Sequence, residues 1–234
     1  MSHEIVERTR ELAETTALEA VWSQWTALTS LAVDSARPPA WTVVDPEALV
    51  LASLLLSPLE PRLEDQVAAW AREAGFLMSK PRFRGVVALF PEEVESRVAD
   101  FARYATQGGD SRWRSWVSSE SSEHSPREKS LGPLHLTSGP ALVLRLRAAF
   151  GVTAKADILA MLLGLDGTAM GLKAIASSLG YSERMIRTAT EEMALAGFIV
   201  EVEGRPSSFY VDAEPWASVL RPYFREVPDG EPWV

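Results

Sequence analysis

Two arginines and two hydroxyl side chains lie close together between residues 182 and 188, in a pattern suited to nucleic acid. The four residues are Ser182, Arg184, Arg187 and Thr188. Arg184, Arg187, Thr188 and Glu191 are spaced i, i+3, i+4 and i+7, so they share one face of a helix that points away from the core. A guanidinium can donate two hydrogen bonds to O6 and N7 of guanine, and hydroxyls bond to phosphate oxygens. The pattern predicts an exposed helix face whose chemistry suits nucleic acid, and the alternative is a solvated face without a ligand.

This helix needs a partner that holds it in place, and the preceding residues supply one. Apolar residues at i, i+3, i+4 and i+7 predict a first helix, and they are Leu172, Ile175, Ala176 and Leu179. Gly180 ends that helix, because glycine enters the left-handed conformation without a steric cost. Ser182 is a favourable N-cap for the second helix. The second helix buries a separate stripe of Ile186, Ala189, Met193 and Ala196.

A β-hairpin is expected directly after the second helix. Gly197 stops the helix, and residues 198–203 alternate as in a half-buried strand. Residues 203–207 form a compact turn, and residues 208–211 return as the second strand. Arg205 lies in the turn, where it is available to a phosphate backbone.

The order helix, turn, helix, hairpin resembles the winged helix-turn-helix of prokaryotic regulators of the ArsR/MarR kind. The resemblance rests on Tyr181-Ser182, the second-helix arginines, the 196–198 Ala-Gly-Phe junction and the Gly204-Arg205 turn, over about the last third of the chain. It implies that Ser182, Arg184, Arg187 and Thr188 lie on a recognition helix and Arg205 on the wing. It also implies a DNA-binding transcriptional regulator that acts as a homodimer.

A protein partner is the alternative to DNA. Residues 140–234 contain nine Lys or Arg and twelve Asp or Glu, so the region lacks the basic excess typical of DNA-binding domains. An acidic chain with two winged-helix domains would resemble chromosome-associated adaptors of the segregation and condensation protein B type. An antitoxin-like regulator paired with an enzyme is a further variant of this alternative.

The N-terminal half carries a weak echo of the C-terminal pattern. Ala-Gly-Phe at 74–76 repeats the junction at 196–198, and residues 83–89 read as a strand. This predicts a second, degenerate winged helix with a basic hairpin that contains Lys80, Arg82 and Arg84. Those cations would contact phosphates, or would instead protect an edge strand from aggregation. The competing interpretation is an unrelated helical domain.

Composition divides the chain into four parts. They are a helical domain at 1–104, a linker rich in Ser and Gly at 105–139, the winged helix at 140–214, and a tail at 215–234. Trp113 and Trp116 are unusual in a linker and are expected to anchor it on a domain surface. The opening helix, expected from Glu4 to Leu31, places Trp22 and Trp25 on a stripe that packs in the core or on a second subunit.

The remaining features argue against catalysis and against a cofactor or metal. The chain contains no cysteine, and His3, His124 and His135 show no ligand spacing. No phosphate-binding glycine motif or nucleophile elbow is present. The net charge of −9 disfavours indiscriminate binding to anionic polymers or membranes. The fold class expected is therefore mainly α with small β-hairpins, in a cytoplasmic protein that is not an enzyme and does not enter the membrane.

Overall fold

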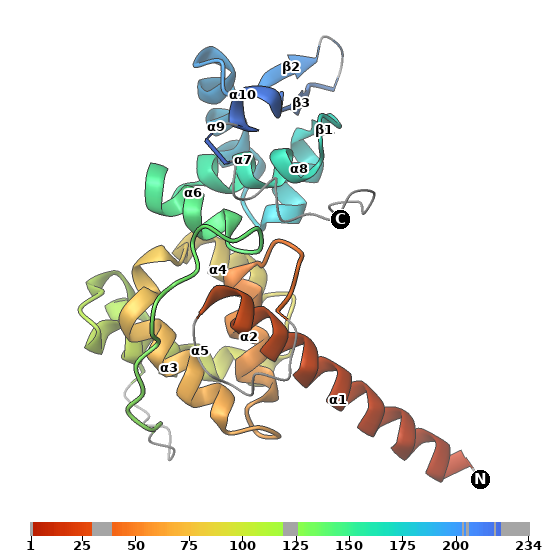
Figure 1. The fold of residues 1–234 in the computed structure, drawn as a ribbon, viewed down its shortest axis with the longest axis vertical. Coiled ribbons are helices and arrows are strands. Elements are labelled where there is room, and N and C mark those ends of the chain that lie inside the picture. Colours follow the sequence, from red (N-terminus) through yellow and green to blue (C-terminus); the bar gives the residue numbers. More distant parts are fainter. Residues whose placement is uncertain are drawn as a thin grey trace.

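The protein consists of two helical lobes stacked end to end (Figure 1). The computed structural model describes residues 2–29, 39–118, 126–202, 204, 206–217 and 219–220. We call residues 2–116 the N-terminal lobe and residues 142–217 the C-terminal lobe. The prediction of a mainly α fold is confirmed, and in place of separate small β-hairpins the described residues contain one three-stranded antiparallel sheet.

The N-terminal lobe is built around buried aromatic side chains. Its elements are α1 (Ser2–Leu28), α2 (Pro46–Leu56), α3 (Arg62–Ala74), the 3-10 turn η1 (Gly75–Leu77), α4 (Lys80–Val87), α5 (Glu92–Gln107) and the 3-10 segment η2 (Ser111–Trp116). Trp25 of α1 meets Trp70 of α3 edge to face, with ring centroids 5.2 Å apart. Trp113 of η2 meets Phe101 of α5 at 4.8 Å. Large apolar surfaces of this kind supply most of the drive for folding.

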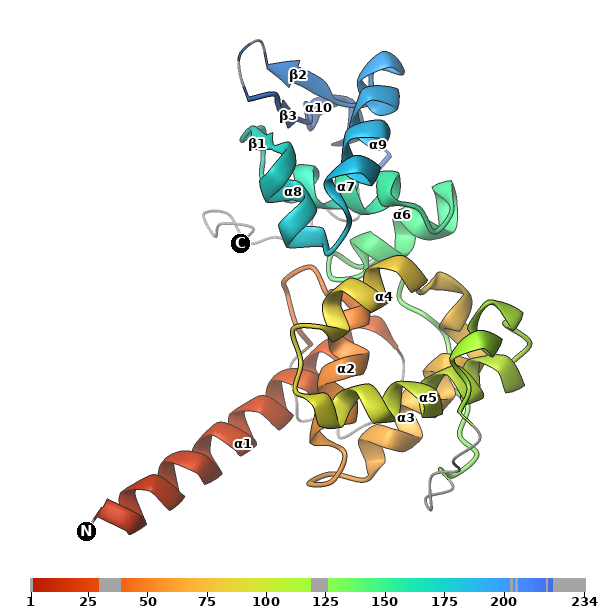
Figure 2. The same ribbon diagram turned by 180° about the vertical axis from the view of Figure 1, so that it is seen from behind.

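Helix α1 packs on the lobe only through its second half. Trp22 and Trp25 are each 1% exposed, as the core interpretation predicts. The first half projects away from the body of the molecule (Figure 2), and Ile5 and Leu12 are largely exposed there. The predicted end of this helix, at Leu31, lies outside the described residues.

The predicted hairpin of the N-terminal half is wrong, because Lys80–Val87 forms helix α4. The Ser79 hydroxyl caps this helix by accepting from the Arg82 amide, and Pro81 lies in the first turn, where its missing N–H costs nothing. Phe83 and Val86 then face the core at i and i+3. A capped helix that buries two apolar residues prevails over the β-propensity of residues 83–89. Within the described residues, all strands belong to the C-terminal lobe.

The described parts of residues 105–139 pack on the N-terminal lobe instead of hanging free. Trp113 is fully buried and Leu131 is 1% exposed. The His135 amide donates to the Leu28 carbonyl at 2.9 Å, and Thr29 forms a single antiparallel bridge to Leu134. The expected anchoring by Trp113 agrees with this arrangement.

The C-terminal lobe combines helices with one three-stranded sheet. Its elements are α6 (Leu142–Phe150), α7 (Ala154–Gly164), β1 (Met170–Gly171), α8 (Leu172–Leu179), α9 (Glu183–Leu195), β2 (Val200–Val202), β3 (Ser208–Tyr210) and α10 (Glu214–Ala217). The strands are antiparallel in the order β1-β3-β2, so β3 is the central strand. Phe209 of β3 lies opposite Met170 of β1 on one edge and opposite Glu201 of β2 on the other. Strand β1 was not expected from the sequence.

The turn between α8 and α9 follows from two residues. Gly180 has a φ of 68°, in the left-handed region that glycine tolerates. The Ser182 hydroxyl accepts from the Met185 amide at 3.3 Å and so caps α9. None of the helices in the described part of the chain is long and apolar enough to cross a membrane.

Candidate functional site

The exposed face of α9 carries the side chains that the sequence singled out. Ser182, Arg184, Arg187 and Thr188 are all exposed, while Ile186 on the opposite face is fully buried. Among the described residues, neither arginine makes an ion pair or a side-chain hydrogen bond. The structure therefore brings these four residues together with two uncommitted guanidinium groups. Arg205, the fifth predicted residue, lies outside the described residues.

Two hollows flank this face of α9. One has a volume of about 700 Å³ and lies between α8, the start of α9 and residues 206–207, with Lys173, Ser177 and Arg187 on its walls. The other has a volume of about 560 Å³, and Arg184 and Thr188 line it beside Lys155 and Tyr181. Acidic side chains are present as well, since Lys155 pairs with Glu192 of α9 at 2.6 Å.

The second basic group of the sequence, Lys80, Arg82 and Arg84, does not share a surface. Lys80 donates to the Arg112 carbonyl at 2.7 Å and lies 5.2 Å from the centroid of the Trp116 ring. Arg84 is exposed and lies 5.4 Å from the centroid of the same ring. These two cations therefore flank one indole on η2.

Arg82 instead points into the contact between the lobes and is 6% exposed. Its guanidinium pairs with Asp45 and with Glu47, the latter at 3.2 Å, and donates to the carbonyl of Leu179 at the end of α8. Each nitrogen of this guanidinium is therefore engaged in a contact with a buried or half-buried partner, and the side chain is not part of an exposed basic surface.

Arg147 of α6 is the centre of a buried ionic cluster that joins the two lobes. Its side chain is fully buried and donates to both oxygens of Glu47 at 2.6 and 2.9 Å and to both oxygens of Asp157 at 2.8 and 3.0 Å. It also donates to the Leu77 carbonyl at 2.9 Å. Glu47 belongs to α2 of the N-terminal lobe, and Asp157 to α7 of the C-terminal lobe. The cluster is therefore shared by both lobes.

Tyr181 extends the cluster to the turn before α9. Its hydroxyl donates to Asp157 Oδ2 at 2.7 Å and lies 2.7 Å from the Ser79 hydroxyl. The backbones also meet closely here, since a Cβ atom built on Gly85 of α4 would overlap the carbonyl of Gly180. Helix α4 of the N-terminal lobe thus holds the α8–α9 turn through hydrogen bonds and backbone contact.

Burial and charge act against each other in this cluster. Burial by itself lowers the pKa of Arg147, but attraction to Glu47 and Asp157 outweighs burial and raises it above the ordinary value. Burial raises the pKa of Glu47, and Arg147 opposes that shift. All the contacts on the Glu47 oxygens are donors, including the Ser79 amide at 2.7 Å, so the site accommodates the carboxylate form. Burial, followed by the charge of Asp157, raises the pKa of Tyr181.

Sequence reasoning missed this cluster, although it left a faint signal. Arg147 and Asp157 lie in two largely apolar segments, residues 141–150 and 154–165, which also contain Arg145 and Lys155. Charged residues are seldom fully buried unless they are paired. The signal does not distinguish the buried Arg147 and Asp157 from the more exposed Arg145 and Lys155, and it does not identify Glu47, which is 100 residues from Arg147.

Comparison with known proteins finds no match to this chain among family models, curated proteins or solved structures. Within the described residues, no group of three or more acidic or histidine side chains is arranged to hold a metal ion.

Proposed function

We propose that the chain is a DNA-binding transcriptional regulator in which the C-terminal lobe is a winged helix. In this proposal α9 is the recognition helix, the β2–β3 hairpin is the wing, and the protein acts as a homodimer in the cytoplasm. The observation that carries the proposal is the exposed face of α9, where Arg184 and Arg187 have no ionic partner among the described residues. Unpaired guanidiniums beside hydroxyl groups favour phosphate and base-edge contacts.

The roles within the site follow from position. Arg184 and Arg187 lie in the first two turns of α9, the part of a recognition helix that reaches base edges. Lys173 of α8 lines the same hollow as Arg187, and we assign it to a phosphate. The Ser182 and Thr188 hydroxyls would complete the backbone contacts. The net charge of −9 limits non-specific affinity, so binding should be strongest at low salt.

A fluorescence anisotropy titration with a labelled duplex pool of random sequence tests the proposal. The double variant Arg184→Ala/Arg187→Ala should lose duplex binding and keep its circular dichroism spectrum, since each base contact contributes about 1–3 kcal/mol. The matched control is Arg8→Ala/Arg114→Ala, which removes the same charge from exposed positions of the N-terminal lobe and should bind as the native protein does. Native protein that binds no duplex at low salt would refute the proposal.

Salt dependence distinguishes DNA from a protein partner. Arg184, Arg187 and Lys173 place three cations per protomer at the duplex, or six in a dimer. With one counterion released for each, affinity should fall about 10³-fold between about 50 and 200 mM salt. Salt screens contacts between apolar surfaces far less, so the affinity for a protein partner bound through such surfaces should change little over the same salt range.

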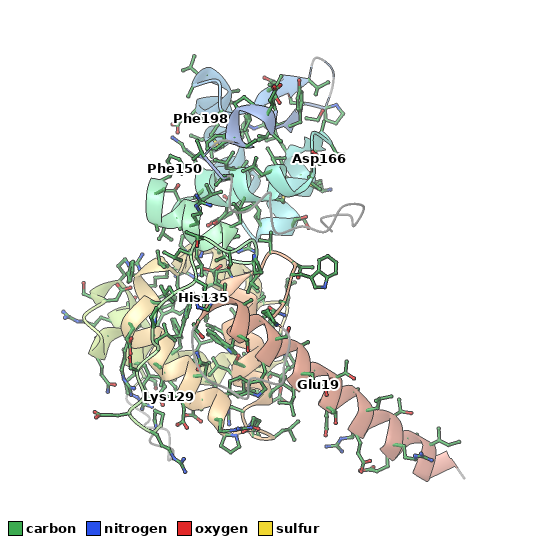
Figure 3. The ribbon with its side chains drawn as sticks, in the orientation of Figure 1. Glu19, Lys129, His135, Phe150, Asp166 and Phe198 are labelled. Carbon is green, nitrogen blue, oxygen red and sulfur yellow. The ribbon has the colours of Figure 1, made fainter. Side chains whose placement is uncertain are left out.

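The second candidate function, docking on a protein, is favoured by a specific surface. Phe150 and Phe198 lie on the same side of the C-terminal lobe (Figure 3), and both rings contact the Trp216 indole at centroid distances of 6.2 and 5.9 Å. Both phenylalanines remain about half exposed, and Leu195 is 91% exposed. Apolar side chains grouped in this way suit a protein partner. Capture of one defined protein that does not weaken with salt, together with no binding of any duplex, would support this protein-docking function. Duplex binding that persists after loss of Arg184 and Arg187 would not support it.

A further inference from the structure

Besides the two hollows next to α9, a cavity lies between the lobes, next to the ionic cluster, and has the features of a small-molecule site. Its volume is about 310 Å³. Residues of both lobes line it, from the segment before α2 and from α4, α6, α7 and α8. Ligand sites are most often concave, mainly apolar and located where domains meet, with a few polar groups that fix orientation.

The walls of this cavity are apolar and partly exposed. Val43, Val143, Met161 and Leu165 line it, and all four pack against the core of the C-terminal lobe while remaining partly accessible. Covering these side chains with a hydrocarbon group would remove apolar surface from water, which is favourable.

Three charged residues line the cavity, Asp45, Asp157 and Arg82, and together they carry one more negative than positive charge. The ionic cluster contains three carboxylates, Asp45, Glu47 and Asp157, and two guanidiniums, Arg82 and Arg147, so it holds one more negative than positive charge. The Asp45 side chain is 34% exposed. The other four side chains of the cluster are at most 8% exposed, namely those of Glu47, Asp157, Arg82 and Arg147. The surplus negative charge is therefore accessible at Asp45.

The Asp45 carboxylate still has capacity to accept a hydrogen bond. Its Oδ1 accepts from the amides of Glu47 and Ala48, each at 3.1 Å, and its Oδ2 accepts from Arg82. A carboxylate offers about four acceptor positions, so Oδ2 retains one. A single free acceptor on a charged oxygen suits an ammonium group better than a metal ion, which needs several ligands.

We propose that this cavity binds a small amine with a hydrocarbon body, with its ammonium group on Asp45 Oδ2 and its apolar part between Val143, Met161 and Leu165. The arginines do not favour an anionic ligand: Arg147 does not line the cavity and has five hydrogen bonds, and the charge of Arg82, which does line it, is balanced by its pairs with Asp45 and Glu47.

The position of the cavity also connects it to α9. Ser178 and Leu179, which line the cavity, are the last residues of α8, and Arg82 donates to the Leu179 carbonyl. A ligand lying on these residues contacts the support of α9 directly. This link rests on the proposed function, and through it the amine would regulate duplex affinity.

NMR titration of the full chain with hexylamine, hexan-1-ol and hexanoate tests the site. Hexylamine should shift the resonances of residues around the cavity and should bind about tenfold more tightly than hexan-1-ol, since a charge-assisted hydrogen bond contributes that much. Hexanoate should not bind. Equal binding of the three compounds, or no binding of hexylamine, would overturn the proposal.

Gly164 provides a matched pair of variants. It lines the cavity at the end of α7, and a Cβ atom there meets nothing within 4 Å. Gly164→Ala should fold and retain hexylamine binding, while Gly164→Leu should fold and lose it, because the longer side chain fills the cavity. Asp45→Asn keeps an N-cap residue for α2 and should abolish the preference for hexylamine over hexan-1-ol. Native-like binding by Gly164→Leu would contradict the proposed location.

The regulatory link needs its own measurement. Saturating hexylamine should change the duplex affinity of the native protein at least about threefold and leave that of Gly164→Leu unchanged. Unchanged affinity in the native protein would overturn the link. If no duplex binds at all, the proposed function fails, while the NMR titration still decides whether the cavity binds amines.

Discussion

Replacing Arg147 with methionine should destabilise the protein by about 3–5 kcal/mol, the cost of removing one partner from a buried ion pair. The variant Arg147→Met keeps an unbranched side chain of comparable length but no donors. Glu47 and Asp157 would stay buried and would lose the four hydrogen bonds that Arg147 donates to them. Only Arg82 would remain as a counter-ion for Glu47, at 3.2 Å.

The size of this effect can be compared with the stability of the whole chain. Domains of ordinary size unfold with free energies of about 5–15 kcal/mol, so the loss would be a large fraction of the total. Urea unfolding followed by circular dichroism measures it, as a lower midpoint. A transition that splits into two steps would show that the lobes then unfold separately, because the cluster contains residues of both.

Arg145→Met is the matched control. Arg145 lies on the same helix, is only partly buried, and donates one hydrogen bond, to the Val219 carbonyl at 2.8 Å. Its loss should cost about 1 kcal/mol or less. In a double-mutant cycle, Glu47→Gln should cost less in the Arg147→Met background than in the native protein. A loss below about 1 kcal/mol for Arg147→Met, or one equal to that of Arg145→Met, would refute the reasoning.

Three further predictions concern stability. Gly85→Ala should lower the unfolding midpoint in urea far more than Gly164→Ala, because a Cβ at Gly85 overlaps the Gly180 carbonyl and one at Gly164 meets nothing; equal midpoints would contradict this contact. Trp113→Ala should cost about 3–5 kcal/mol, as for other fully buried aromatic residues, and a near-native midpoint would show that residues 105–139 do not support the lobe. Burial raises the pKa of Tyr104 to about 12, so its contribution is fully present below the ordinary pKa of 10.0 and is lost as pH rises toward 12. Urea midpoints measured between those pH values should fall less steeply in Tyr104→Phe, and an unchanged slope would exclude this contribution.

The arrangement of the C-terminal lobe was largely predictable, because it depends on local interactions. The turn requires a left-handed residue, and only Gly180 meets that need at low cost. The start of α9 depends on a cap that Ser182 supplies within three residues. Strands β2 and β3 follow from alternation and a short connection. The exposure of Arg184 and Arg187 follows in turn from the periodicity of α9, since the opposite face is apolar.

Tertiary structure decided what local signals could not. Residues 83–87 have strand-like composition, but they form a helix in which Phe83 is buried against Phe101 and Trp113, so tertiary packing overrides the local propensity. Arg82 read as a surface cation, yet the fold places it beside Asp45 of another helix start. Ion-pair partners such as Arg82 and Asp45 lie far apart in the chain, so no rule of sequence spacing identifies them.

The ionic cluster shows most clearly the difference between what the sequence determines and what tertiary structure decides. The sequence by itself determined only that residues 141–150 form an apolar segment with arginines at 145 and 147, and it did not show which of the two is buried. Only the stacking of the two lobes decided that Arg147 is buried and that its partners are Glu47 and Asp157, because a buried guanidinium is tolerated only where carboxylates from separate elements converge on it. The cavity beside the cluster exists for the same reason, as its walls come from both lobes and no single segment contains it.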